Sequence, residues 1–183
     1  MAAARDGQRD GQRDHEPAGG VIVRPALADD AETIARIYNH HVDAGGATFD
    51  TIHWDAPTVR RWLPPSPPAA WYVVSDDKRS ADVIGWGTLR PISERNGFRF
   101  TLESGIYLAA EAVGTGVADP LQRRLLDHCR EHHIHHVMAR IIADNARSIA
   151  FHRRHGFETI GVQKQIGHLQ NRWVDLAVMQ CLL

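Results

Sequence analysis

The chain has 183 residues, enough for one ordinary domain with a sizeable core but not comfortably for two. Its net charge is −1 and 43 % of its residues are hydrophobic, so we expect a soluble protein that binds neither nucleic acid nor membranes. Apolar runs are too short to span a bilayer, and two cysteines without metal-type spacing fit a reducing, cytoplasmic compartment.

The first 19 residues have a composition of their own. The unit Arg-Asp-Gly-Gln occurs twice there and a third copy begins. Nothing in this stretch could form a core, so residues 1–19 are expected to be a disordered tail. Residues 20–183 are then a single domain.

The first third of that domain predicts a strand followed by two helices. Residues 21–23 are a short apolar strand, and Asp29 with Glu32 forms a capping box for a helix. The helix ends at the glycine pair 45–46, and its apolar face consists of Ile34, Ile37, Tyr38 and Val42. A shorter helix is expected over 57–63, before a proline-rich break.

Three strands are predicted in the middle of the chain. Residues 71–74 and 83–89 read as neighbouring strands joined by a polar turn. A longer strand is expected over 98–108, where Phe98, Phe100 and Leu102 alternate with polar residues. Gly105 interrupts this alternation and predicts a bulge or a splayed pairing.

The second half alternates helices and strands. A helix should follow residue 116, because apolar residues recur at every fourth position, namely Val117, Leu121, Leu125 and Cys129. A strand over 136–143, a helix over 145–155 and a closing hairpin of strands 159–166 and 173–182 complete the chain. The expected fold class is α/β (α+β), with one central mixed sheet and flanking helices.

The most informative segment is residues 103–121. A strand that carries Glu103 runs into a turn with Gly114 and Gly116, and this turn opens a helix. Such a turn directs backbone N–H groups at one point, and the helix adds the positive end of its dipole, which suits a pyrophosphate. An anion cradle beside a proton acceptor indicates a group-transfer enzyme with a nucleotide-bearing donor.

Six segments in order resemble the GNAT superfamily of acetyl-CoA-dependent N-acetyltransferases. The resemblance covers residues 21–183 and extends to the branch of phosphinothricin and methionine sulfoximine N-acetyltransferases. The matching segments are residues 37–42 (IYNHHV), 47–49 (ATF), 101–108 (TLESGIYL), 145–149 (NARSI), 152–157 (HRRHGF) and 172–175 (RWVD).

The resemblance implies that acetyl-CoA binds where two strands splay and that an amine attacks the thioester directly, without a metal. The backbone of Ile106, Tyr107 and Leu108 would bind the pantetheine arm, and the Leu108 N–H would polarise the acetyl carbonyl. The implied pyrophosphate cradle is Gly114, Thr115, Gly116, Val117, Ala118 and Asp119. Asn145, Ser148 and Arg154 complete the implied cofactor set.

Two catalytic residues follow from the resemblance. Glu103 matches the general base, which takes the proton that the amine must lose; the alternative is an ion pair with Arg99 on the same strand face. His152 would protonate the departing thiolate; the alternative is a helix histidine that packs or caps. The implied amine pocket consists of Phe49, Asn96, Gly97, Phe98, Arg99, His168 and Arg172, in which arginine suits a carboxylate.

The expected activity is acetylation of a small amino-acid-like amine, such as phosphinothricin or methionine sulfoximine or sulfone, by a homodimer. Two features depart from the branch. Val113 stands where a glutamine or arginine usually begins the phosphate loop, with Glu111 nearby, and Leu169 and Asn171 replace a lysine and a glycine. Alternatives are a non-catalytic acyl-CoA sensor, or transfer to a polyamine, an aminoglycoside or a protein N-terminus.

A histidine cluster over residues 128–136 suggests a metal as a further alternative. His128 and His132 are four apart on a helix, which is compatible with zinc ligation. No carboxylate or further cysteine completes a defined site there. We therefore expect no functional metal.

Overall fold

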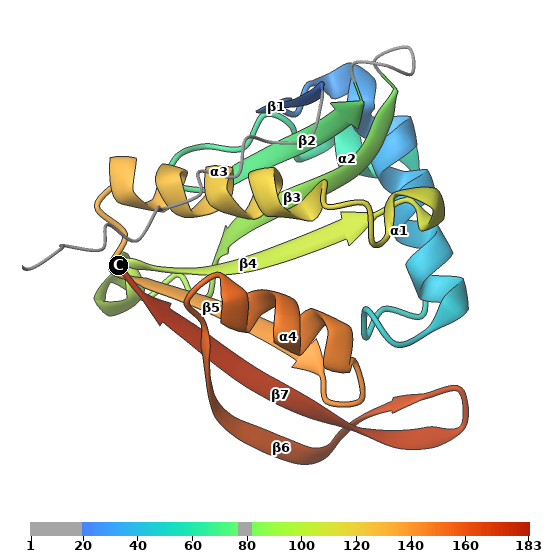
Figure 1. Ribbon diagram of the computed structural model, residues 1–183, viewed down its shortest axis with the longest axis vertical. Helices are drawn as coiled ribbons and strands as arrows, with labels where there is room; N and C mark the ends of the chain where they lie inside the picture. Colours follow the sequence, from blue (N-terminus) through green and yellow to red (C-terminus); the bar gives the residue numbers. More distant parts are fainter. Residues whose placement is uncertain (1–19, 77–81) are drawn as a thin grey trace, which may run out of the picture.

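The computed structural model describes residues 20–76 and 82–183, which contain one seven-stranded sheet in the order β1-β2-β3-β4-β5-β7-β6 (Figure 1). The predicted tail 1–19 and most of the turn before residue 83 lie outside the described residues. The strands are β1 (Val21–Pro25), β2 (Ala70–Asp76), β3 (Val83–Pro91), β4 (Thr101–Leu108), β5 (His136–Ile142), β6 (Glu158–Leu169) and β7 (Arg172–Leu182).

The sheet is mixed, as predicted. β4 and β5 run parallel, because α3 and its flanking loops cross over between them, and the other neighbouring strands pair antiparallel. β7 lies between β5 and β6, so the final hairpin extends the sheet beyond β5. The fold class expected from the sequence is confirmed.

Helices cover both faces of the sheet. They are α1 (Ala31–Ala44), α2 (Ala56–Arg61), α3 (Ala118–Glu131) and α4 (Ala146–Arg154). Consecutive residues of β3 show the two faces: Trp86 contacts Tyr38 of α1, whereas a Cβ atom on Gly87 would lie 2.9 Å from Leu125 of α3. The predicted apolar stripe of α3 is buried along its whole length.

The start of α1 differs from the prediction. The first helical turn is a 3₁₀ turn over Ala28–Asp30, and the N-cap of α1 is Asp30, without a side-chain capping bond among the described residues. The Asp30 carboxylate instead binds the Leu27 N–H at 2.7 Å and pairs with Arg24. The capping box of Asp29 and Glu32 was therefore wrong, because Arg24 of β1 and the Leu27 N–H engage the neighbouring acid Asp30.

The strand expected over 98–108 begins three residues later, at Thr101. Asn96–Phe98 form a 3₁₀ turn, and Phe98 and Phe100 are 43 % and 45 % exposed. The backbone N–H groups of His135 and His136 both donate to the Phe100 carbonyl, which ties this turn to the start of β5. The predicted strand was therefore too long at its start: the chain before Thr101 forms a turn, and the strand begins at Thr101.

An aromatic cluster lies between the sheet and α1. Trp86 is fully buried and stacks on Trp71 and on Tyr107, with ring centroids 4.8 and 4.7 Å apart. Tyr38 contacts the Tyr107 ring edge-on at 4.9 Å and stacks on Trp54 at 3.6 Å. This cluster holds the end of β4 rigidly against the helix layer.

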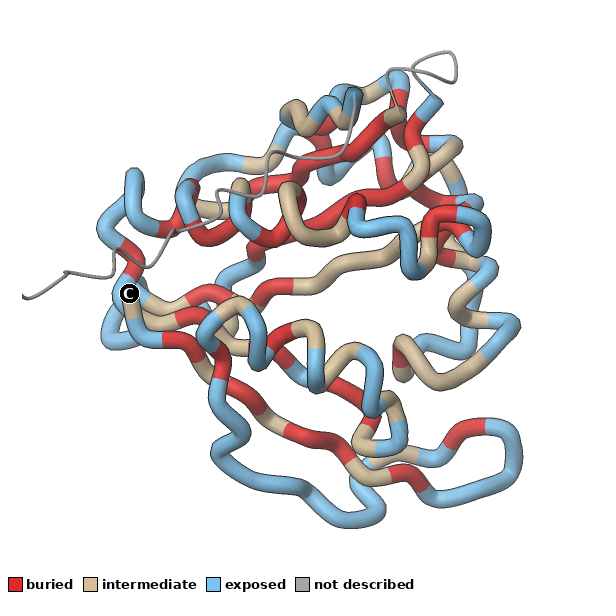
Figure 2. The backbone as a smooth tube through the Cα atoms, in the orientation of Figure 1, coloured by how far each residue is buried: buried red, intermediate tan, exposed pale blue. Residues whose placement is uncertain are grey.

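The last two strands differ in burial. β7 carries buried side chains at alternating positions, whereas β6 is exposed along most of its length (Figure 2). β7 therefore contributes its buried side chains to the core. None of the described helices is long and apolar enough to cross a membrane.

Candidate active site

A cleft opens where β4 and β5 separate. Their pairing runs from Thr101↔His136 to Glu103↔Met138 and stops there, although β4 stays paired with β3 up to Leu108. Residues 104–108 and 139–142 then line a cleft of about 940 Å³. The splayed pairing predicted at Gly105 is present, and the β3–β4 register runs through Gly105 without a shift.

The backbone at the end of β4 is available on the cleft side. His41 Nε2–H donates to the Leu108 carbonyl at 2.8 Å, so this carbonyl points away from β3. The N–H and C=O groups of one strand residue point to the same side. The Leu108 N–H therefore also faces away from β3, as an oxyanion donor in the cleft would require.

The glycine turn forms the far end of this cleft. Gly114 and Gly116 have φ angles of 86° and 90°, and no described atom lies within 4 Å of the position that a Cβ atom would take on either residue. α3 begins two residues after Gly116, without a side-chain cap among the described residues, and of its first N–H groups that of Asp119 donates back to the Gly116 carbonyl at 3.1 Å. This open, amide-lined turn fits a pyrophosphate.

Asp119, in the first turn of α3, is paired with residues at the C-terminal end of α4. His155 Nε2 lies 2.8 Å from Asp119 Oδ1, and Arg154 Nη2 lies 3.8 Å from the same oxygen. Two residues predicted to bind the cofactor, Asp119 and Arg154, thus face each other across the cleft. Thr115 and Val117 do not line it, and the Thr115 hydroxyl donates to the Ala112 carbonyl.

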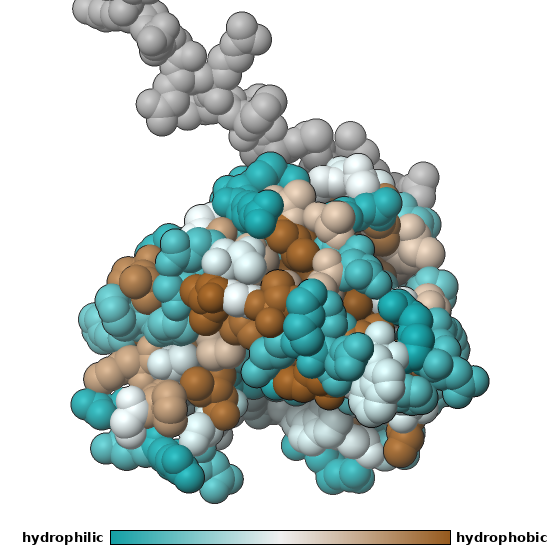
Figure 3. All heavy atoms as spheres, turned by 90° about the horizontal axis from the view of Figure 1, so that it is seen from below, coloured by the Kyte–Doolittle hydropathy of each residue, from teal (hydrophilic) through white to brown (hydrophobic). Residues whose placement is uncertain are grey.

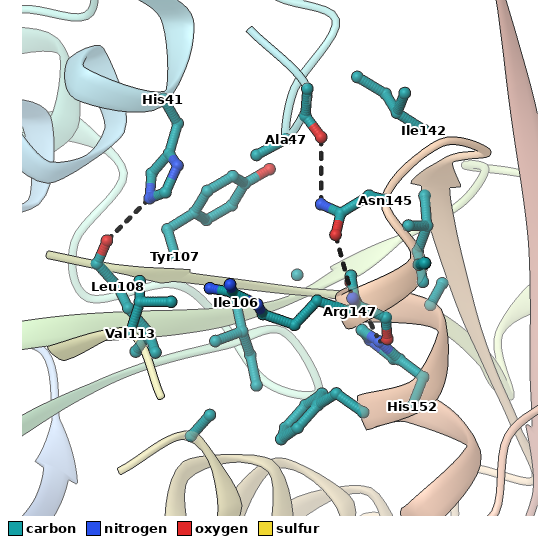
Figure 4. A pocket seen from close by; sticks show the side chains of 18 of the residues that line it. His41, Ala47, Ile106, Tyr107, Leu108, Val113, Ile142, Asn145, Arg147 and His152 are labelled. Carbon is teal, nitrogen blue, oxygen red and sulfur yellow. Dashed lines mark hydrogen bonds between the residues drawn. The ribbon is translucent and has the colours of Figure 1, made fainter. Parts of the chain in front are cut away.

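Asn145 holds together the side of the cleft that α4 and the loop after α1 form. Its Oδ1 accepts the Ser148 N–H at 3.0 Å as the N-cap of α4, and its Nδ2 donates to the Gly46 carbonyl at 3.1 Å (Figure 4). This second bond ties the loop after α1 to α4. Asn145 and Ser148 both line the cleft, as predicted for cofactor-binding residues.

His152 lines the cleft but is 5 % exposed. Because a carbonyl can only accept, the 2.8 Å contact to the Ser148 carbonyl places the proton on Nδ1, and Nε2 carries a lone pair in the neutral ring. Burial lowers the pKa of His152, which favours that neutral ring. In this state the ring proton is held by the Ser148 carbonyl, and Nε2 can only accept a hydrogen bond. The role of His152 as proton donor to the thiolate stays a prediction.

The buried histidines make stability depend on pH. Burial lowers the pKa values of His41, His128 and His152, so the unfolded chain binds protons first as the pH falls below about 6.5. We expect the urea midpoint to be highest above that pH and to fall between about pH 7 and pH 5.5. A His152→Gln variant should have a shallower slope, and an unchanged slope would contradict this assignment.

Glu103 lies at the point where β4 and β5 separate. Its two carboxylate oxygens accept hydrogen bonds from Arg140 Nε and Nη2 at 2.7 and 2.8 Å, and Arg90 Nη2 lies 3.8 Å away. The side chain is 14 % exposed. The alternative partner Arg99 instead donates to the Asn96 carbonyl and lies over the Phe100 ring, so Glu103 pairs with neighbouring strands rather than with its own.

A second pocket of about 340 Å³ adjoins the cleft and shares Tyr107 and Arg140 with it. Burial raises the pKa values of Tyr38 and Tyr107, so both phenols are neutral. The Tyr38 hydroxyl donates to Asp50 Oδ2 at 2.6 Å. The described residues that line this pocket are Tyr38, Ala47, Thr48, Phe49, Asp50, Arg90, Tyr107, Arg140, Ile142, Ile166 and Leu176.

The predicted amine-pocket residues do not gather at this pocket. Phe49 lines it, but the Asn96–Phe98 turn and Arg99 precede β4, at the opposite end of the strand from Leu108. His168 packs edge-on against Trp173 on the last hairpin. Arg172 lines the larger cleft and donates to Asp144 at 3.1 Å.

Both hairpin departures have structural explanations. Leu169 is buried in a small apolar cluster with Ile142, Val174 and Phe49. Asn171 has a φ angle of 61° in the tight turn of the hairpin, a conformation that asparagine adopts more readily than other non-glycine residues. The asparagine can therefore replace the glycine of the branch without changing the turn.

In the histidine cluster, His128 makes structural contacts. The two ring nitrogens of His128 contact the Tyr72 hydroxyl and the Pro68 carbonyl, both at 3.1 Å, and tie α3 to β2. Within residues 20–76 and 82–183, no group of three or more histidine, cysteine or acidic side chains is arranged to hold a metal ion.

Several site residues were missed from the sequence: His41, Thr48, Asp50, Arg90, Arg140 and Arg147. Arg90 and Arg140 lie on the strands that flank β4, and their approach to Glu103 depends on strand register. Arg140 lies within the predicted strand 136–143, whereas Arg90 comes one residue after the predicted strand 83–89, so the sequence pattern did not place both beside Glu103.

Comparisons with known proteins agree with this geometry. The acetyltransferase (GNAT) domain family matches residues 21–158. The chain is 30 % identical over 159 residues to the phosphinothricin N-acetyltransferase of Streptomyces coelicolor, covering 86 % of this chain and 93 % of the relative. It is 29 % identical to the L-methionine sulfoximine/L-methionine sulfone acetyltransferase of Pseudomonas paraeruginosa, covering 86 % and 92 %.

A solved structure extends the likeness to the cofactor. A GNAT superfamily phosphinothricin acetyltransferase from Sinorhizobium meliloti, in complex with AcCoA, matches with a TM-score of 0.83 at 31 % identity, covering 89 % of this chain and 88 % of that one. The splayed sheet and amide-lined turn thus define an acetyl-CoA-dependent N-acetyltransferase. The chain belongs to the GNAT acetyltransferase family.

Proposed function

We propose that this enzyme acetylates the amine of a small amino-acid-like compound, of the phosphinothricin or methionine sulfoximine and sulfone type. Acetyl-CoA in the cleft supplies the activated acetyl group. The C–N bond forms as the C–S bond breaks, and the amine gives up its proton to Glu103, directly or through a water molecule. The Leu108 N–H stabilises the oxygen of the acetyl carbonyl.

This proposal rests on the charged side chains that line the second pocket. Two guanidinium groups, of Arg90 and Arg140, flank the single carboxylate of Glu103 and both line the pocket. Arg90 and Arg140 are each about half exposed, so their positive charge is open to a ligand, whereas the carboxylate of Asp50, which also lines the pocket, accepts the Tyr38 hydroxyl. A carboxylate or phosphinate on the amine substrate would neutralise this positive charge.

The position of Glu103 supports its role as base. It lies where the strands separate, beside Arg140, which lines both the cleft and the second pocket. Each carboxylate oxygen has a further lone pair beyond the one that accepts from Arg140. The bidentate bond holds the carboxylate in one orientation. Glu103 itself is not among the residues that line the cleft or the second pocket, which favours proton transfer through a water molecule.

The test is acetyl-CoA-dependent thiol release with a panel of amines. We expect phosphinothricin, methionine sulfoximine or methionine sulfone to be turned over, and the methyl ester of the active compound to react poorly because it lacks the carboxylate. Arg90→Gln should raise KM for the acid by about tenfold, the value of a charged hydrogen bond, and leave KM for the ester unchanged.

Arg99→Gln is the matched control, because Arg99 lies over Phe100, before the start of β4. Equal KM effects on acid and ester, or an effect of Arg99→Gln as large as that of Arg90→Gln, would contradict a carboxylate site at Arg90. Thiol release with polyamines or peptides, but with none of the amino-acid-like compounds, would show that the substrate is another kind of amine.

We also propose that the enzyme is a cytoplasmic homodimer. Both cysteines are free and buried, which suits a reducing compartment. Seen from the side of β6 and β7, the surface carries apolar side chains between hydrophilic ones (Figure 3). The exposed apolar residues of these strands include Ile160, Val162, Ile166 and Trp173, which a second subunit could cover.

A further inference from the structure

The arginines of the cofactor cleft differ in their partners. Arg140 pairs with Glu103 at 2.7 Å, Arg172 with Asp144 at 3.1 Å, and Arg154 with Asp119 at 3.8 Å. Arg147 also lines the cleft, yet within residues 20–76 and 82–183 it has no hydrogen-bond or ion-pair partner. Its charge is therefore uncompensated in a cleft that receives a polyanionic co-substrate.

The place of Arg147 in its helix is unfavourable for a cation. It is the second residue of α4, directly after the N-cap Asn145 and Ala146, where the positive end of the helix dipole lies. The other basic residues of α4, His152, Arg153 and Arg154, are in the last turn, where the dipole favours them. Helix stability thus does not explain an arginine at position 147.

The side chain extends into the cleft. Figure 4 shows Arg147 reaching from α4 toward Ile106 of β4 on the opposite wall. On that wall the phosphate turn begins with Val113, and its nearest charged neighbour along the chain is the acid Glu111. The glycine turn therefore offers backbone N–H groups without a positive side chain of its own.

We infer that Arg147 binds the pyrophosphate of acetyl-CoA from the α4 side and replaces the cationic side chain that the turn lacks at Val113. The turn is the cradle for this pyrophosphate, and Arg147 lies on the facing wall of the same cleft. A guanidinium suits two phosphate oxygens because its N–H donors form a planar fork. The inference rests on acetyl-CoA as co-substrate and not on which amine is acetylated.

Calorimetric titration with CoA tests this without any turnover. Arg147→Gln should weaken CoA binding by about tenfold, as expected for the loss of one charged hydrogen-bonding group. Arg147→Lys should keep part of the affinity. Arg153→Gln is the matched control: Arg153 is on the same helix, is exposed and does not line the cleft, so its loss should leave the affinity unchanged.

Truncated ligands locate the contact. Dephospho-CoA lacks the 3′-phosphate but keeps the pyrophosphate, so Arg147→Gln should weaken its binding by the same factor. A pantetheine ligand has no phosphate and should bind both proteins alike. The inference is overturned if Arg147→Gln binds CoA with wild-type affinity. It is also overturned if Arg147→Gln weakens the binding of CoA but not of dephospho-CoA, because the contact is then to the 3′-phosphate.

Discussion

Glu103→Gln is expected to lower kcat by about 100-fold or more at neutral pH, the usual contribution of a general base. Glutamine keeps the shape of the side chain but has no carboxylate to accept a proton. The measurement is thiol release across a pH series with the best amine of the panel. The deficit should narrow as the pH rises, because a larger fraction of the amine is then neutral before it binds.

Glu103 also holds Arg140, so this variant needs a control that breaks the ion pair and keeps the carboxylate. Arg140→Met does so, because it removes both hydrogen bonds to Glu103. If Glu103 is the base, Arg140→Met should keep a larger part of kcat than Glu103→Gln does, because the carboxylate that accepts the proton is still present. A pH-independent deficit of equal size in both variants would show that the ion pair, and not proton transfer, is what the carboxylate provides.

Trp86→Ala is expected to cost about 3–5 kcal/mol of unfolding free energy, as large aromatic truncations in a core do. Trp86 is fully buried between Trp71 and Tyr107, and its removal would leave a cavity beneath the end of β4. Urea denaturation at neutral pH measures this loss. A drop in acetyl transfer should accompany it, because Tyr107 lies between the cleft and the second pocket.

Two variants separate packing from a general effect of losing tryptophan. Trp86→Phe keeps an aromatic ring in the stack and removes an indole N–H that has no partner among the described residues, so it should cost less than about 1.5 kcal/mol. Trp173→Ala alters a side chain that is 63 % exposed and should change stability little. A loss in Trp86→Ala no larger than in Trp173→Ala would contradict a rigid aromatic core at the site.

Local patterns in the sequence predicted most of the elements that carry the site. The four-residue apolar spacing from Val117 to Cys129 predicted α3, and glycines 114 and 116 marked the turn before it, because both signals depend on neighbours a few residues apart. Asn145 was predicted as a cofactor-binding residue, and the structure shows it as the N-cap of α4. The splay was expected at Gly105, close to where the β4–β5 pairing ends.

The partners of these residues could not be predicted in the same way. Arg99, four positions before Glu103, was the local candidate for its ion pair, but β4 begins only at Thr101 and Arg99 belongs to the turn. Arg140 approaches from a strand 37 residues away. Asn96 and Arg99 likewise precede β4 and do not line the second pocket, so their proposed part in amine binding stays a prediction.

The sequence by itself therefore determined the family, the mixed α/β fold, the glycine turn before α3 and the acid on β4, because each depends on short-range pattern or on motif order. Only the tertiary structure decided what surrounds that acid and which charges line the cleft. Parallel pairing of β4 with β5 brings Arg140 to Glu103, and in the part of the chain that the structure describes no acid pairs with Arg147. Strand register and helix placement set these contacts, and neither is encoded in any one segment.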